Sequence, residues 1–378
     1  MAVTSGTVST YPFPVRKIID HACRRAGIVP QRLSAEDLEV CLDLLFTLTS
    51  EWANAGFPLW TRQYGLLGCQ IGSPNVQTPP GTVEVLHSYW RIFNPYRGPA
   101  TLSTGAGDIL LFGGQPNADV NIPGPNPAVS VNFTSITETD TIGVLSGVAV
   151  PFTAALQLNI SVDGVTWVPF QTLPSAIYTP GQWTYFDLNP TVQTQYLQIV
   201  NPGPGAWTVN QLNFALANGQ DIENGPLNID DYYNLPDKMF RSDRPNSTYQ
   251  DRQVAGPVLF IWPTLNTEGF YNGTVSCLSR RHIQDPGTLT NIMELPQRWF
   301  EAIVWRLASR VIDEIPPPSD PNSSSANNPY GAMVPLQTMQ ARTTRCETMA
   351  ARSEALVWSE ERVRAPVKLL PSIRPYTA

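Results

Sequence analysis

The chain has few of the features that mark disulfide-rich, secreted or membrane-spanning proteins. Its cysteines are spread over 378 residues with no close pair and no C-x-x-C motif, so we expect free thiols and synthesis in a reducing compartment. The amino-terminal residues lack the basic start and apolar run of a signal peptide, so none is expected. No stretch approaches the roughly 18 apolar residues of a membrane-spanning helix, and we expect no membrane partner. The five cysteines are Cys23, Cys41, Cys69, Cys277 and Cys346.

Signatures of catalysis and metal binding are also scarce. The histidines His21, His87 and His282 stand in unrelated contexts, and the chain has no HExxH, GxSxG, paired Cys/His or Walker-type motif. Adjacent Asp230 and Asp231 could ligate a metal, but adjacent carboxylates more often cap a helix or face water. We therefore expect a protein without enzymatic activity, metal or cofactor.

A cell-wall or capsule hydrolase is the enzymatic alternative. Asp119 and Glu138 could act as its acid and base, because glycosidases use two carboxylates, but a chain of this length offers many such pairs. His21 falls on the polar side of the first predicted helix, so we expect a surface histidine there and not a general base.

Basic residues are absent from a long central stretch. No Lys or Arg occurs between Arg97 and Lys238, whereas eleven Asp and Glu residues lie in that interval. From Lys238 onward the chain carries 16 basic and 13 acidic residues, and the end after Glu361 is basic and free of acids. A specific nucleic-acid binder needs a basic face, so the acidic middle argues against a grip on DNA.

The most informative pattern that is present predicts a helix over residues 296–315. Pro296 suits the first helical turn, where a missing N–H costs nothing, and Pro316 forbids continuation. Between them, apolar residues recur at intervals of three and four and form one wide face. The partners of this face must lie near the amino terminus, because most of the intervening chain is predicted to be strand and loop.

Two amphipathic helices are predicted there. The first runs from Pro14 to Gly27, a residue type that suits a left-handed C-terminal cap. The second opens with the capping-box-like pattern Ser34-Ala-Glu-Asp37 and stops at Gly56. Short isolated helices are marginal in water, so we expect both to pack on each other and on residues 296–315. The expected core residues of this helical module are Leu45, Trp52, Trp60, Trp299, Ile303 and Leu307.

A fourth helix is predicted from about Pro335 to Val363. Its apolar stripe is weak and partly polar, so we expect a half-exposed helix or one that contacts another subunit. The Pro-, Ser- and Asn-rich loop before it, at residues 316–329, is low in complexity and is expected to be mobile.

From about Gly105 to Gly219 the apolar pattern has a period of two. Alternation from Leu156 to Val162 runs into Asp163-Gly164, a strong hairpin signal, and short strands with Pro, Gly and Asn turns predict a sandwich or jelly roll. The runs ISVDGVTWVPF, WTYFDL and YLQIV resemble discoidin-like, galactose-binding-like β-sandwiches. Loops at one end of that fold can bind sugar, but no residue here allows a sugar site to be carried over.

These patterns predict an α+β protein. About four helices from both chain ends form a helical module, and an antiparallel β region with a jelly-roll or discoidin-like sandwich is inserted between them. The predicted segments are 1–62 (amino-terminal helices), 63–104 (β segment), 105–220 (inserted sandwich), 221–290 (β and loop return), 291–364 (carboxy-terminal helices) and 365–378 (carboxy-terminal arm).

Four pieces of sequence, taken in order, resemble the head-to-tail adaptor proteins of short-tailed bacteriophages, of the tail-accessory or tail-tubular-A type. They are Leu44–Trp60, Ile229–Lys238, Arg244–Arg252 with Val258–Pro263, and Leu295–Ile303 with Leu307 and Ala308. The resemblance covers residues 12–100 and 222–365 and leaves the 105–220 sandwich as an insertion whose own task it does not explain.

The resemblance implies a virion protein of the phage neck and tail, made in the host bacterial cytoplasm. A homo-oligomeric ring of about twelve copies would join the portal protein to the tail nozzle protein. Packaged DNA would pass through the lumen without sequence-specific binding, and the ring would help to retain it. The insert could anchor tail fibres. The residues that carry the family motif are Tyr232, Tyr233, Lys238, Pro245, Trp262 and Pro263.

The carboxy-terminal arm is expected to contact the portal or a neighbouring subunit. It is basic and proline-rich, which makes it a poor core segment and a good one to order on binding; a disordered terminus is the alternative. The expected interface residues of this arm are Arg362, Arg364, Lys368, Leu369, Leu370, Ile373, Arg374 and Tyr376.

Two further alternatives concern binding. The aromatic stretch Asp231–Lys238 could be a ligand platform, although packing or subunit contact is the more common role of such clusters. The whole chain could instead be a glycan- or fibre-binding protein that uses the discoidin-like insert. Exposure of Trp167, Trp183 or Trp207 would favour that hypothesis, and burial would place them in the core.

Overall fold

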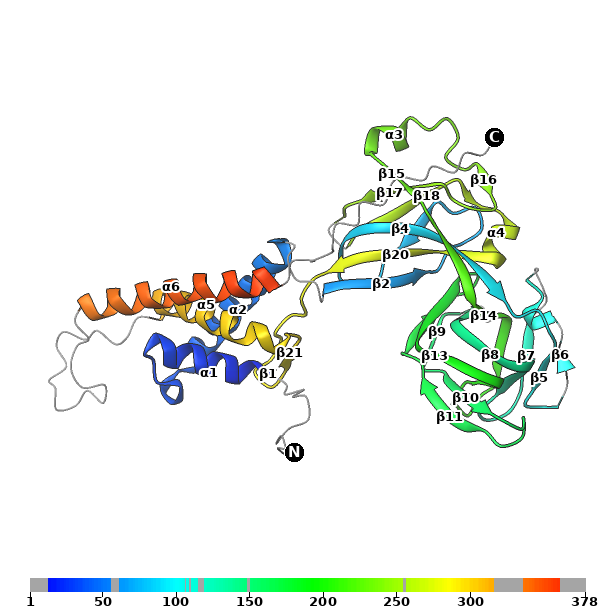
Figure 1. Ribbon diagram of the computed structural model, residues 1–378, viewed down its shortest axis with the longest axis horizontal. Coiled ribbons are helices and arrows are strands. Elements are labelled where there is room, and N and C mark those ends of the chain that lie inside the picture. Colours follow the sequence, from blue (N-terminus) through cyan, green and yellow to red (C-terminus); the bar gives the residue numbers. More distant parts are fainter. Residues whose placement is uncertain are drawn as a thin grey trace, which may run out of the picture. The chain divides into compact units, whose positions relative to one another are not determined.

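The computed structural model describes residues 13–55, 61–105, 107–108, 110–114, 119–147, 150–253, 256–315 and 336–360. The chain divides into two compact units, Met1–Thr61 with His282–Ala378, and Arg62–Arg281. Long helices occupy the first unit and most strands the second, so the predicted α+β class, with a helical module built from both chain ends, is confirmed (Figure 1). Within these ranges no helix is long and apolar enough to cross a membrane.

The first unit, here called the helical unit, contains four long helices and one short strand pair. The helices are α1 (Val15–Ala26), α2 (Ala35–Ala55), α5 (Phe300–Glu314) and α6 (Leu336–Glu360), with 3₁₀ turns at Pro30–Arg32 and Gln297–Trp299. Antiparallel β1 (Phe13–Pro14) and β21 (Ile292–Met293) join the two parts of the chain.

Local sequence signals set the ends of these helices. Gly27 adopts φ 84° after α1, a left-handed cap that glycine takes without steric cost. Before α2, the Ser34 hydroxyl accepts from the Asp37 N–H at 3.0 Å, and the Asp37 carboxylate accepts from the Ser34 N–H at 2.9 Å. This reciprocal pair is the predicted capping box.

Helix α5 is the centre of the helical unit. It packs against α1, α2 and α6, and side chains around most of its circumference are buried. Helices α1 and α2 both pack on α5, as expected, and these contacts are larger than those between α1 and α2, because the apolar residues of α5 face several directions. Direct contact between them includes the buried thiols of Cys23 and Cys41.

The second unit, here called the β unit, is built around an 11-stranded sheet with the path β11-β10-β13-β8-β14-β4-β20-β2 and with β5, β6 and β7 attached. Its strands are β2 (Arg62–Leu67), β4 (Thr82–Pro95), β5 (Ala100–Leu102), β6 (Gly107–Asp108), β7 (Val120–Ile122), β8 (Ala128–Ser146), β10 (Gln157–Ser161), β11 (Val168–Thr172), β13 (Trp183–Val200), β14 (Trp207–Glu223) and β20 (Gly273–Arg281).

Two large hydrophobic cores lie in this unit, and a third, small one joins Leu145 and Trp183 to Phe270 and Tyr271. Strands β5, β7, β8, β10, β13 and β14, with β12 (Ala176–Tyr178), which pairs with β9 (Phe152–Ala154), enclose the larger core of the predicted sandwich. The second large core lies between β2, β4 and β20 and a four-stranded sheet. That sheet has the order β15 (Gly225–Leu227), β17 (Ser247–Asp251), β18 (Val258–Trp262) and β3 (Asn75–Gln77). Short elements complete the unit: α3 (Ile229–Tyr233), α4 (Thr267–Asn272), β16 (Arg241–Ser242), β19 (Thr264–Leu265) and the 3₁₀ turn Leu110–Phe112.

The sandwich is not attached through two loops. Strand β14 pairs with β8 over Val209–Leu216 and with β4 over Ala215–Glu223, so it runs through residue 220, where the sequence predicted the insert to end. The sheet is continuous across this boundary because β14, with 17 residues, is long enough to pair with both β8 and β4.

Candidate functional site

Five of the six residues predicted for the helical core lie in it. Leu45, Trp299, Ile303 and Leu307 are fully buried, and Trp52 is nearly so. The Trp52 and Trp299 rings meet edge to face with centroids 4.8 Å apart, a favourable arrangement for two aromatic quadrupoles. Trp60 lies outside the described residues.

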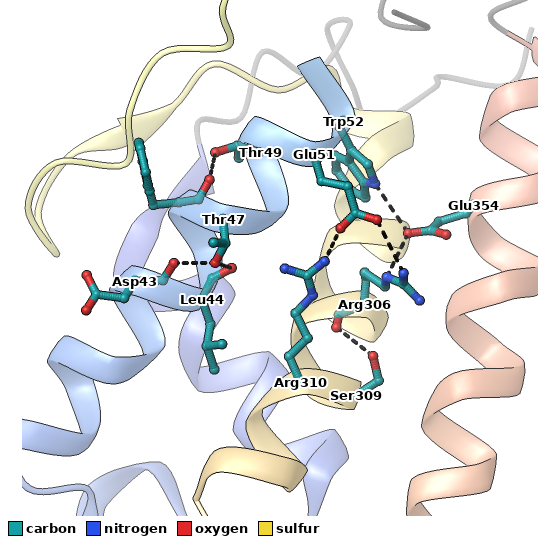
Figure 2. Close-up of polar contacts among 11 residues, drawn as sticks. Asp43, Leu44, Thr47, Thr49, Glu51, Trp52, Arg306, Ser309, Arg310 and Glu354 are labelled. Atoms are coloured by element: carbon teal, nitrogen blue, oxygen red, sulfur yellow. Dashed lines mark hydrogen bonds and ion pairs between the residues drawn. The ribbon is translucent and has the colours of Figure 1, made fainter. Parts of the chain in front are cut away.

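A charged cluster ties α2, α5 and α6 together (Figure 2). The Arg306 guanidinium lies 3.6 Å from the Glu51 carboxylate and 3.5 Å from that of Glu354, and Arg310 forms a second ion pair with Glu51. The Trp52 indole N–H donates to Glu354 at 3.3 Å. Burial raises the pKa of Glu354, and the nearby Arg306 opposes that shift only in part. The cluster therefore orients α6, and it includes one carboxylate, that of Glu354, whose ionisation is disfavoured by burial.

A second polar contact joins α1 to α5. Arg25 binds the Glu301 carboxylate through two nitrogens, at 2.6 and 2.8 Å, and its guanidinium stacks 4.2 Å from the Trp305 ring centre. The Arg25 hydrogen bonds hold the pKa of Glu301 below its ordinary value. His21 is partly exposed on α1; its ring packs edge to face on Phe300 at 5.6 Å, and burial lowers its pKa.

The segment that carries the family resemblance starts at α3. Asn228 caps this helix by accepting from the Asp231 N–H at 2.8 Å. Asp230 and Asp231 lie in the first turn of α3 and are exposed. The sequence favoured this position, at a helix start and facing water, over a role as metal ligands. Tyr232 points the other way: it is buried and stacks on Tyr249 of β17 at 5.1 Å.

Residues after α3 are fixed by hydrogen bonds to the backbone. The Lys238 ammonium donates to the carbonyl oxygens of Tyr233 at 2.9 Å and Leu235 at 3.4 Å, and it lies over the Tyr232 and Tyr233 rings. The Trp262 indole N–H donates to the Asp237 carbonyl at 2.9 Å. Pro245 and Pro263 are buried.

This ordered segment exposes large apolar side chains beside carboxylates, and we call it the α3 surface. Ile229, Tyr233, Met239 and Phe240 are 54%, 63%, 55% and 53% exposed. Asp230, Asp231 and Asp237 are exposed within the same segment. Exposed apolar side chains that gather in one patch are a feature of interaction surfaces.

Two cavities open on the β unit. One, of about 670 Å³, is lined by Asp119, Ser146 and Asn210 of the sandwich and by Phe270 and Tyr271. The other, of about 500 Å³, lies beside β4, β15 and β17 and includes His87, Glu223 and Tyr249 in its lining. His87 and Glu223 are 3.9 Å apart at its rim.

The carboxylates considered for hydrolase chemistry have structural partners. Asp119 accepts from the Asn210 amide at 2.9 Å, and Glu138 accepts from the Thr191 hydroxyl at 2.7 Å. In the described ranges, no group of three or more His, Cys, Asp or Glu side chains is placed to hold a metal ion.

Sequence reasoning missed a polar cluster on the large sheet. Arg91 of β4 binds the Asp221 carboxylate of β14 at 2.8 and 2.7 Å. Burial raises the pKa of Asp140 on β8 and of Asp187 on β13, and the Arg91 charge opposes both shifts. These residues are far apart in sequence, and only the strand register brings them together, so no local pattern could have identified them.

The tryptophans named for sugar binding are mostly core residues. Trp183 and Trp207 are buried, and Trp167 is half-buried. The interface residues predicted for the carboxy-terminal arm, from Arg362 to Tyr376, lie outside the described residues, as does the loop at 316–329.

No family model and no curated protein matches this chain. Among solved structures it is similar to the family 32 carbohydrate-binding module of Clostridium perfringens NanJ in complex with galactose, with a TM-score of 0.28 and 9% identity, over 33% of this chain and 98% of that one. It is also similar to a chitosan-binding module of a Paenibacillus chitosanase/glucanase (TM-score 0.26, 15% identity, 33% of this chain and 96% of that one). A pectin-binding carbohydrate-binding module gives a TM-score of 0.26 at 13% identity, over 33% of this chain and 92% of that one.

Each of these neighbours matches about a third of the chain. With TM-scores below 0.3 and identities of 15% or less, these similarities carry no argument about function.

Proposed function

We propose that this chain is a structural protein of a phage particle, a head-to-tail adaptor whose copies close into a ring between the portal and the tail nozzle. The observation that supports it best is the helical unit, in which α5 brings together helices from both chain ends. This unit is formed by the chain segments before and after the β unit, as expected for a body that carries an inserted β part. The family resemblance falls on α2, on α5 and on the α3 surface.

Two other features support assembly as the function. Hydrogen bonds fix the backbone of the α3 surface, and four large apolar side chains on it are exposed to water. This is the state expected of a subunit contact before the subunits assemble. Helix α6 buries only a narrow face of mostly small side chains, Cys346, Ala350, Ser353 and Val357, and leaves the rest of its circumference largely open. Such a helix fits a second partner better than it fits a monomeric core.

The test is native mass spectrometry of the purified full chain, alone and mixed with the portal protein from the same genome. A closed ring, or a monomer that becomes a stoichiometric ring on the portal, is the expected result. A chain that stays monomeric and ignores the portal would rule the adaptor function out.

Carbohydrate binding by the sandwich is the second candidate, and the 670 Å³ cavity favours it. Its lining combines the Asp119–Asn210 polar pair with aromatic walls from Phe270 and Tyr271, and sugar sites need both hydrogen-bonding and apolar surface. The neighbours named above include modules whose structures contain galactose or that bind chitosan or pectin.

A glycan array probed with the full chain tests this candidate. Binding that disappears in Asp119→Ala, and persists in the matched surface change Asp313→Ala of the helical unit, would support it. Silence across the array with the folded wild-type chain would remove it. The two functions are compatible, because a ring can carry binding modules.

A further inference from the structure

We propose that the α3 surface of one copy docks on helix α6 of the next copy, and that this head-to-tail contact closes the ring. The inference rests on the proposed adaptor function and names the interface that it requires. A head-to-tail contact uses two different surfaces on each copy, and repetition of such a contact closes into a ring when the rotation permits.

The first half of the contact is acidic and apolar. The α3 surface exposes Ile229, Tyr233, Met239 and Phe240 together with the carboxylates of Asp230, Asp231 and Asp237. Its position in the fold is well determined, because Tyr232 anchors it on Tyr249 and Trp262 holds the Asp237 carbonyl. The Lys238 ammonium is bonded to two carbonyl groups of the segment and does not neutralise the exposed acids by an ion pair in the described structure.

The second half is basic and apolar. Arg345, Met349, Arg352 and Leu356 follow one another on α6 at spacings of four, three and four, so they form one stripe on its surface. Arg345 and Arg352 are exposed, Leu356 is 59% exposed and Met349 is half-buried. Within the described residues neither arginine forms an ion pair, and the stripe contains no acid. The stripe lies one residue before the buried face of Cys346, Ala350, Ser353 and Val357, so the packing of α6 on α5 covers part of Met349 and leaves the two arginines and Leu356 exposed.

Charge and apolar character therefore match across the two surfaces. Exposed carboxylates on one side meet exposed guanidinium groups on the other, and each side adds large apolar groups that gain by leaving water. Arginine is also the basic residue best suited to interfaces, because its planar guanidinium stacks on aromatic rings such as Tyr233 and Phe240 while it pairs with a carboxylate. A second copy of this chain is thus the occupant that the chemistry of both surfaces favours.

The experiment reverses the charges on each side and then combines them. Arg345→Glu with Arg352→Glu, and separately Asp230→Lys with Asp231→Lys, should each weaken ring formation at least tenfold in the concentration required, measured by native mass spectrometry with and without the portal. All four residues are exposed, so circular dichroism and the melting temperature should stay at wild-type values. Arg24→Glu with Arg62→Glu is the control for the arginine reversal: it makes the same change in net charge at exposed positions outside both surfaces and should leave ring formation unchanged.

Rescue decides the case. Mixing the two reversed variants should restore rings in which the copies alternate, because every interface then pairs opposite charges again. Failure of the mixture to assemble, or normal assembly of either variant alone, overturns the proposed contact while the adaptor function stands. A wild-type chain that forms no ring in any condition overturns both.

Discussion

Truncation of Leu307 to alanine tests the division of the chain into two separately folded units. Leu307 is fully buried at the centre of α5. In the part of the chain that the structure describes, the apolar core around it contains no residue from Arg62–Arg281, and the three cores of the β unit contain none from outside that range. The loss of one core contact should therefore stay within one unit.

The size of the effect follows from the side chain removed. Leucine loses three carbon groups, worth about 0.8 kcal/mol each on transfer from water, so about 2.4 kcal/mol is the minimum. The cavity left in a well-packed helical core raises the total to within the roughly 2–5 kcal/mol measured for buried leucines. For units of this size that corresponds to a fall in melting temperature of roughly 5–15 °C.

Differential scanning calorimetry is the assay, and Leu158→Ala is the matched control. Leu158 lies fully buried in the sandwich core, so the same chemical change falls in the other unit. We expect Leu307→Ala to lower the transition of the helical unit alone and Leu158→Ala to lower that of the β unit alone. A single transition that both variants shift equally would show that the two units unfold as one and would refute the reasoning.

Four further predictions concern single groups. Burial raises the pKa of Glu354 above its ordinary 4.5, so its contribution to stability falls as pH rises from 4.5 through the folded-state pKa; Glu354→Gln should flatten that fall in the free energy of unfolding measured against pH. Glu301 behaves in the opposite sense, because Arg25 lowers its pKa: the stability it contributes is present above pH 4.5 and is lost below it, and Glu301→Gln should remove that loss on acidification. Asp163 accepts hydrogen bonds from the N–H groups of residues 165 and 166, so Asp163→Ala should speed amide hydrogen exchange in the β10–β11 hairpin and leave exchange in β14 unchanged. Deletion of residues 365–378 should leave the melting temperature unchanged and weaken binding to the portal; undiminished binding would show that these residues are not an arm.

Much of the helical unit could be read from local sequence, because its signals act over one turn. The reciprocal bonds of Ser34 with Asp37 and the left-handed Gly27 are decided by chemistry within a few residues of each helix end. The burial of Leu307 and Ile303 follows from their three- and four-residue spacing. The contact between His21 and Phe300 could not be predicted, because Phe300 comes from the opposite end of the chain.

The sequence predicted that the β unit consists of strands, but it did not predict which strands pair. Period-two alternation identified the strands and the Asp163-Gly164 turn, yet alternation carries no information about which strand lies next to which. The Arg91–Asp221 pair and the path of β14 depend on register between strands far apart in sequence. The sequence singled out the aromatic stretch Asp231–Lys238, but only the structure separates inward Tyr232 from outward Tyr233.

The path of β14 has a mechanical consequence for the 105–220 region. A force that acts on the sandwich is transmitted to β4, and from β4 to β20 and β2, through backbone hydrogen bonds between strands and not through a flexible linker. Deletion of residues 105–220 would remove the strand that pairs with Ile92 to Pro95. The backbone N–H and C=O groups of that edge would then be unpaired, and unpaired strand edges promote aggregation. The sandwich is therefore joined to the rest of the β unit by a continuous sheet. Binding of a partner to the sandwich can for this reason transmit force to the other strands of the unit.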